Sequence, residues 1–82
     1  MKKKPLYEIK NLKASEICFG LNRETDEQSL AAFISKFGDA QLLGVLLPRI
    51  TDEEIDALVD TLTRLMRAHL SEKEYHRLFL ND

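Results

Sequence analysis

The segment from Thr51 to Leu70 constrains the fold of this chain most strongly. It opens with Thr-Asp-Glu-Glu, a capping box in which the Thr51 hydroxyl accepts a hydrogen bond from the Glu54 amide while the Glu54 carboxylate reaches back. Side chains at spacings of three and four then share one helix face: Ile55, Leu58, Val59, Leu62, Leu65, Met66, His69 and Leu70. Asp56, Asp60, Arg64 and Arg67 fall opposite. The pattern predicts one amphipathic helix over 51–70, roughly 28 Å long.

An earlier apolar stripe predicts a second helix, at about 26–37. It is formed by Leu30, Phe33, Ile34 and Phe37, which recur at i, i+3, i+4 and i+7. Thr25 or Asp26 is expected to cap its first turn. Gly38 is expected to end it in a left-handed conformation.

The run from Ala40 to Leu47 predicts a short helix capped by Asp39 and stopped by Pro48. Its apolar side chains surround the helix axis, so we expect burial on nearly all sides and a place at the hub of the core. A short buried strand would fit the same apolar run, although helix is favoured.

A second capping box, Ser71-Glu72-Lys73-Glu74, follows the long helix. Beyond it, Tyr75, Leu78 and Phe79 centre about 150° away from the apolar stripe of 51–70. Either the chain bends near Ser71 and a final helix of about 72–80 folds back, or these side chains form an intermolecular contact. The bend is favoured, and Tyr75, Leu78 and Phe79 are the candidate partner-binding residues.

These elements predict an all-α fold, a small irregular or orthogonal bundle of four to five helices. At 82 residues the chain is expected to form a single helical domain over 1–82. Tyr7 and Ile9 alternate with polar residues, which indicates a short extended N-terminal segment. Residues 1–13 are accordingly expected to form a flexible or extended arm.

The chain is expected to be a soluble cytoplasmic protein. Cys18 is the single cysteine, which excludes an intramolecular disulfide and suits a reducing compartment. The lysines at the start precede no apolar h-region, and no apolar run approaches the ~20 residues of a bilayer span.

Cys18, His69 and His76 are the candidates for catalysis or metal binding, and neither role is favoured for them. His69 shares the apolar face of 51–70, where a packed histidine is commoner than a ligand, and His76 and Cys18 do not complete zinc-site spacing. The glycines are too dispersed for a nucleotide-binding loop. We therefore expect no metal, no cofactor and no enzymatic activity.

The basic residues cluster at the N-terminus. This cluster is the basis for an alternative function, nucleic-acid binding. Residues 24–60 hold nine acids against Lys36 and Arg49, whereas residues 1–23 are basic. The candidate nucleic-acid arm consists of Lys2, Lys3, Lys4, Lys10 and Lys13. A helix-turn-helix around Phe37 to Ala40 is disfavoured, because its second helix would offer leucines to the bases.

The leading expectation is a small non-enzymatic protein-interaction module that self-associates through a helix face. A partner subunit is expected because folding of so short a chain buries only about 60–65% of the surface that the unfolded chain exposes. The alternative is a nucleic-acid-associated regulator that uses the basic arm, although nucleic acid is the less favoured partner because the net charge is −2.

Overall fold

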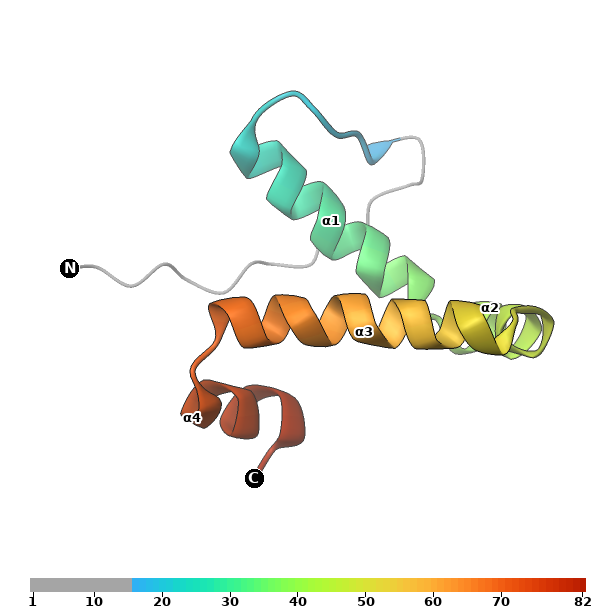
Figure 1. Cartoon of the computed structure of the whole chain (residues 1–82). Coiled ribbons are helices and arrows are strands. Elements are labelled where there is room, and N and C mark those ends of the chain that lie inside the picture. The colour runs from blue at the N-terminus through green and yellow to red at the C-terminus, as the bar shows by residue number, and fades with distance from the viewer. Residues whose placement is uncertain (1–15) are drawn as a thin grey trace. The chain divides into compact units, whose positions relative to one another are not determined.

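The computed structural model describes residues 16–82, and that part of the chain is all-α, as predicted (Figure 1). Its helices are α1 (Arg23–Phe37), α2 (Ala40–Leu46), α3 (Asp52–His69) and α4 (Glu72–Glu74). A 3₁₀ turn, Leu47–Arg49, follows α2, and a π-helix, Tyr75–Leu80, continues α4. The chain divides into two compact units, residues 1–48 and residues 49–82.

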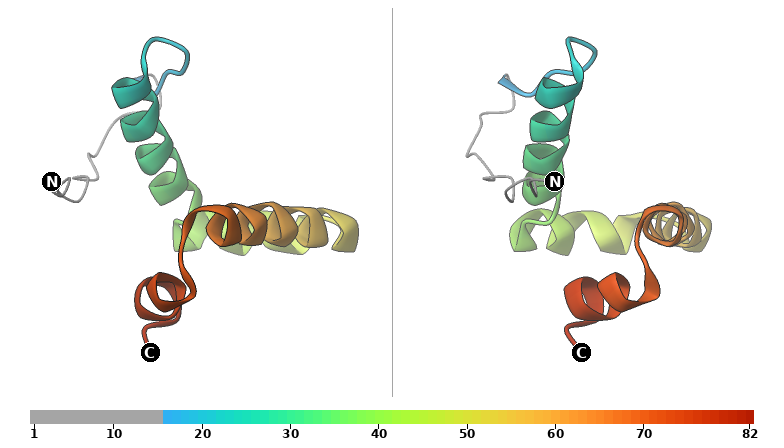
Figure 2. Two further views of the ribbon diagram at one scale, coloured as in Figure 1. Left: turned by 60° about the vertical axis from the view of Figure 1, so that its left-hand side comes forward. Right: turned by 90° about the vertical axis from the view of Figure 1, so that its left-hand side faces the viewer.

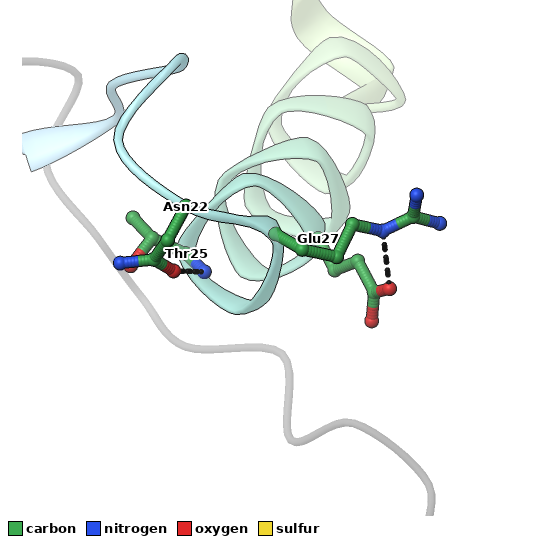
Figure 3. Close-up of polar contacts among 4 residues, drawn as sticks. Asn22, Thr25 and Glu27 are labelled. Atoms are coloured by element: carbon green, nitrogen blue, oxygen red, sulfur yellow. Dashed lines mark hydrogen bonds and ion pairs between the residues drawn. The ribbon is translucent and has the colours of Figure 1, made fainter.

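Helix α1 begins earlier than its apolar stripe indicates. Asn22, not Thr25 or Asp26, is the N-cap, and its Oδ1 accepts a hydrogen bond of 2.8 Å from the Thr25 amide (Figure 3). The Arg23 Nε lies 2.6 Å from the Glu27 Oε2 one turn later. The expected start was wrong because polar capping residues occur in succession here, and the first of them forms the cap.

The loop before α1 is fastened to the helix by two backbone amides. The Gly20 amide donates to the Asp26 Oδ1 at 2.8 Å, and the Cys18 amide donates to the Ser29 Oγ at 3.3 Å. Gly20 has a φ of 95°, a conformation that residues with a Cβ adopt only with strain. The loop therefore takes a defined path along the first half of α1.

The junction between α1 and α2 confirms one expectation and corrects another. Asp39 caps α2, since its Oδ2 accepts hydrogen bonds from the Gln41 and Leu42 amides at 3.0 and 3.1 Å. Gly38 does end α1, but with φ −79° and ψ 5° rather than in the left-handed region. The segment Ala40–Arg49 leaves α1 at an angle of 68°, and Figure 2 shows this sharp bend.

Within residues 16–48, α2 is not the buried hub that the sequence indicates. The buried residues of 16–82 are Ser29 and Ala32, both on α1, at 2% and 1% exposure. No residue of α2 is buried. Apolar side chains on all sides of a short helix indicate that it is buried, but they do not identify the segment or molecule that covers it.

Helix α3 has the capping box expected from the sequence. The Glu54 amide donates to the Thr51 Oγ1 at 3.1 Å, and the Thr51 amide donates to the Glu54 Oε1 at 2.9 Å. Asp60 and Arg64 form the ion pair of the polar face at 3.1 Å. Because α3 runs unbroken for 18 residues, it presents one long continuous face.

The helix breaks where the change of phase predicted a bend. Leu70 is extended, with φ −115° and ψ 143°, and Ser71 and Glu74 then form the second capping box. Residues 71–82, here called the C-terminal hook, turn away from the α3 axis in every view (Figures 1 and 2). The hook ends with Asn81 in the left-handed conformation and the Asp82 amide donating to the His76 carbonyl at 3.0 Å.

Candidate functional site

The most prominent surface feature of residues 49–82 is a row of uncovered apolar side chains on α3. We call it the α3 stripe, and it consists of Ile55, Leu58, Val59, Leu62 and Leu65. These residues are between 39% and 58% exposed. The expected cover for this face is not provided by residues 49–82 themselves, since Ile55 and Leu62 are both exposed. The 3.6-residue period located the apolar face correctly but could not identify its neighbour.

The C-terminal hook covers the last turn of the apolar face. Met66 and Leu70 are half-buried, and Tyr75 of the hook is half-buried with them. A pocket of about 340 Å³ lies here, lined by Met66, Arg67, Leu70, Glu72, Tyr75 and His76. The exposed stripe therefore stops at Leu65, where the hook begins to provide cover.

The structure separates the roles of the three predicted partner-binding residues. The Tyr75 and Phe79 rings are stacked, with centroids 5.5 Å apart and planes 19° apart. Tyr75 lines the pocket beside α3, whereas Leu78 and Phe79 are more than half exposed. Partner binding by Tyr75, Leu78 and Phe79 stays a prediction, and the last two are the accessible ones.

Charges are distributed along α3 with opposite signs in its two halves. Residues 52–60 carry five acids and no base, and residues 61–69 carry Arg64, Arg67 and His69 and no acid. Helix-end preferences alone favour this order, because acids stabilise the amino end of a helix and bases its carboxyl end. Arg67 and His69 belong to the last turn and fit this preference, whereas Asp56 lies beyond the first turn.

Residues 1–48 have an apolar cleft that sequence patterns did not predict. It has a volume of about 410 Å³ and is lined by Ile17, Phe19, Phe33, Lys36, Phe37 and Leu42. The loop residues Ile17 and Phe19 reach it because the Gly20 and Cys18 amides tie the loop to α1. Alternation of apolar residues at 17 and 19 was the one available signal.

The three candidates for catalysis or metal binding, Cys18, His69 and His76, do not form a common site in the described chain. Cys18 and His69 are exposed, and the His76 Nδ1 lies 3.2 Å from the Asp82 Oδ2. Within residues 16–82, no three His, Cys, Asp or Glu side chains are grouped closely enough to hold a metal ion. Lys2, Lys3, Lys4, Lys10 and Lys13, the predicted nucleic-acid arm, lie outside the described residues, as does the predicted extended segment at 7–9.

In the same part of the chain, no single helix has the length and apolar composition to cross a membrane. The bent pair formed by α1 and Ala40–Arg49 meets that test only when its two members are taken together.

Comparisons with protein-family models, with curated proteins and with solved structures found no match to this chain. The function proposed below therefore rests on the geometry of residues 16–82 and on the sequence.

Proposed function

We propose that this protein is a non-enzymatic interaction module that associates with a second copy of itself through the α3 stripe. The supporting observation is the exposure of Ile55, Leu58, Val59, Leu62 and Leu65 along one face of a capped 18-residue helix. Contiguous apolar patches of this kind are uncommon on monomeric proteins and typically mark interaction surfaces.

The free energy available at this face is comparable in size to the cost of association. Burying a large aliphatic side chain completely is worth about 1.5–3 kcal/mol, and roughly half of that remains for side chains that are already half covered. Five such residues on each of two copies therefore offer on the order of 10 kcal/mol before the cost of association, which is ~4–15 kcal/mol. A dimer dissociating in the micromolar range or above fits this balance.

The arrangement of the helices and the domain organisation are not established and belong to the same proposal. The irregular or orthogonal bundle of four to five helices within one chain stays a prediction. The single domain over 1–82 with an arm at 1–13, the cytoplasmic location and the absence of catalysis stay predictions from the sequence.

Sedimentation equilibrium of the full chain from about 1 µM to several hundred µM tests the proposal. The mass is expected to rise from the 9.5 kDa monomer towards twice that value. Leu58→Asp should prevent the rise because it places a charge within the stripe. Ala57→Asp is the matched control, since it adds the same charge to the neighbouring residue away from the stripe. A chain that remains monomeric at several hundred µM would refute self-association.

The alternative, a nucleic-acid-associated regulator, rests only on the lysines of the arm. It predicts binding that weakens steeply with salt and is lost when residues 1–13 are removed. Salt-independent binding, or none, would dispose of that alternative without affecting the first proposal.

A further inference from the structure

The apolar cleft beside α1 has the size and the lining of a small-molecule site. Its volume is about 410 Å³, and ligand pockets commonly measure roughly 300–1,000 Å³. Its lining comes from the loop before α1, from α1 itself and from the first turn of α2: Ile17, Phe19, Phe33, Lys36, Phe37 and Leu42. Such sites are mostly apolar, with a few polar groups that orient the ligand. Lys36 is the polar member here.

Three phenylalanine rings line this cleft without stacking on one another. Phe19 and Phe33 are 54% and 51% exposed, and Phe37 is half-buried. Within the described chain no ring contact joins any two of them, whereas Tyr75 and Phe79 do stack. Aromatic rings gain free energy from an offset-stacked or edge-to-face partner beyond that of burial alone. A flat aromatic ligand supplies the partner that these rings lack.

Lys36 gives the cleft a positive charge that no neighbour neutralises. Its side chain is exposed and forms no ion pair or hydrogen bond within residues 16–82. No acid of residues 16–48 lines the cleft. The helix dipole favours a cation in this last turn of α1, but it leaves the three donors of the ammonium free.

We infer that this cleft binds a small aromatic carboxylate, with the ligand ring among the three phenylalanines and its carboxylate beside the Lys36 ammonium. This goes beyond the proposed self-association, which concerns α3. Apolar walls accept many apolar molecules, and the cation among them favours an anion. One lysine neutralises a single negative charge, so a carboxylate fits better than a phosphate group, which carries about −1.5 to −2.

Titration of naphthalene-2-carboxylate into the isotope-labelled full chain, followed by nuclear magnetic resonance at low salt, tests the inference. A dissociation constant on the order of 1 mM or lower is expected for a ligand of this size. The shift changes should be concentrated at the cleft, around positions 17–20, 33–37 and 42. Changes centred on the α3 stripe, or no saturable change, would overturn the inference and leave the proposed function untouched.

Lys36→Met tests the role of the charge, because methionine keeps an apolar stem and removes the ammonium. Affinity for naphthalene-2-carboxylate should fall about fivefold at low salt. Affinity for the neutral naphthalene-2-carboxamide should stay the same. Lys73→Met is the matched control, since it removes an exposed lysine from the other compact unit and should change neither value. Equal carboxylate binding by the two variants would contradict recognition by Lys36.

Phe33→Leu tests the role of the rings, because leucine keeps an apolar wall and removes the aromatic face. Affinity for naphthalene-2-carboxylate should fall about three- to tenfold, whereas affinity for its saturated analogue, decahydronaphthalene-2-carboxylate, should change less. Phe79→Leu is the control, since Phe79 is 57% exposed in the other compact unit. Equal losses for the aromatic and the saturated ligand would refute stacking in the cleft.

Discussion

Leu62→Ala is the substitution whose effect on association can be worked out most directly. Leu62 is 47% exposed, so about half of the ~1.5–3 kcal/mol for burying a leucine is still available to a partner. Each dimer contains two such residues. Truncation should therefore weaken dimerisation by roughly 1.5–3 kcal/mol, a factor of about 10 to 150 in the dissociation constant.

Leu30→Ala provides a matched control for this measurement. Leu30 lies on α1 and is 49% exposed, so the same atoms are removed from a helix position with the same solvent contact. Leucine and alanine both favour helix, so neither change should disrupt its own helix. Sedimentation equilibrium should show weaker association for Leu62→Ala alone. Equal dissociation constants for the two variants would refute the assignment of the interface to α3.

Three further changes test the local structure. Thr51→Ala removes the hydroxyl bonded to the Glu54 amide and should lower the free energy of unfolding by about 1 kcal/mol in urea titrations; no change would contradict the capping box. Gly20→Ala places a Cβ at φ 95° and should cost about 1 kcal/mol, with faster exchange of the Gly20 amide; unchanged exchange would contradict the loop geometry. Tyr75→Ala should loosen the C-terminal hook in hydrogen exchange more than Phe79→Ala does, because Tyr75 both stacks on Phe79 and lines the pocket beside α3; equal effects would show that the pocket contacts of Tyr75 add nothing.

Local hydrogen-bonding signals allowed much of the secondary structure to be predicted. Thr51 with Glu54, Ser71 with Glu74, and Asp39 all act as caps where the sequence placed them. Each cap depends on residues at most three positions apart, so its chemistry is complete within the local sequence. The bend at Ser71 was predictable for the same reason, together with the change of apolar phase.

Features that depend on neighbours distant in sequence were not predictable. Apolar side chains lie on all sides of α2, which suggested a buried hub. No residue of α2 is buried in the described chain. Ser29 and Ala32, small residues that no apolar pattern singled out, are the buried ones. Periodicity shows which side of a helix avoids water, but the covering surface can belong to any segment or to another molecule.

The candidate site was predicted only in part. The apolar face of α3 was located residue by residue, whereas its exposure emerged only from the structure. Tyr75 shows why. Its angular position, away from the apolar face of α3, suggested a contact surface, but the helix breaks at Leu70 and Tyr75 then lines a pocket beside Met66. The π-helical turns of 75–80 were also unforeseen, since side-chain spacing does not reveal the change in backbone hydrogen bonding.

The most direct test of the central claim is an isotope-filtered nuclear Overhauser measurement on an equal mixture of ¹³C-labelled and unlabelled protein at several hundred µM. If a second copy covers the α3 stripe, methyl protons of Leu58, Leu62 and Leu65 in one copy should show cross-peaks to stripe residues of the other. If a mixture that sediments as a dimer shows no intermolecular cross-peaks from these leucines, the stripe is not the interface.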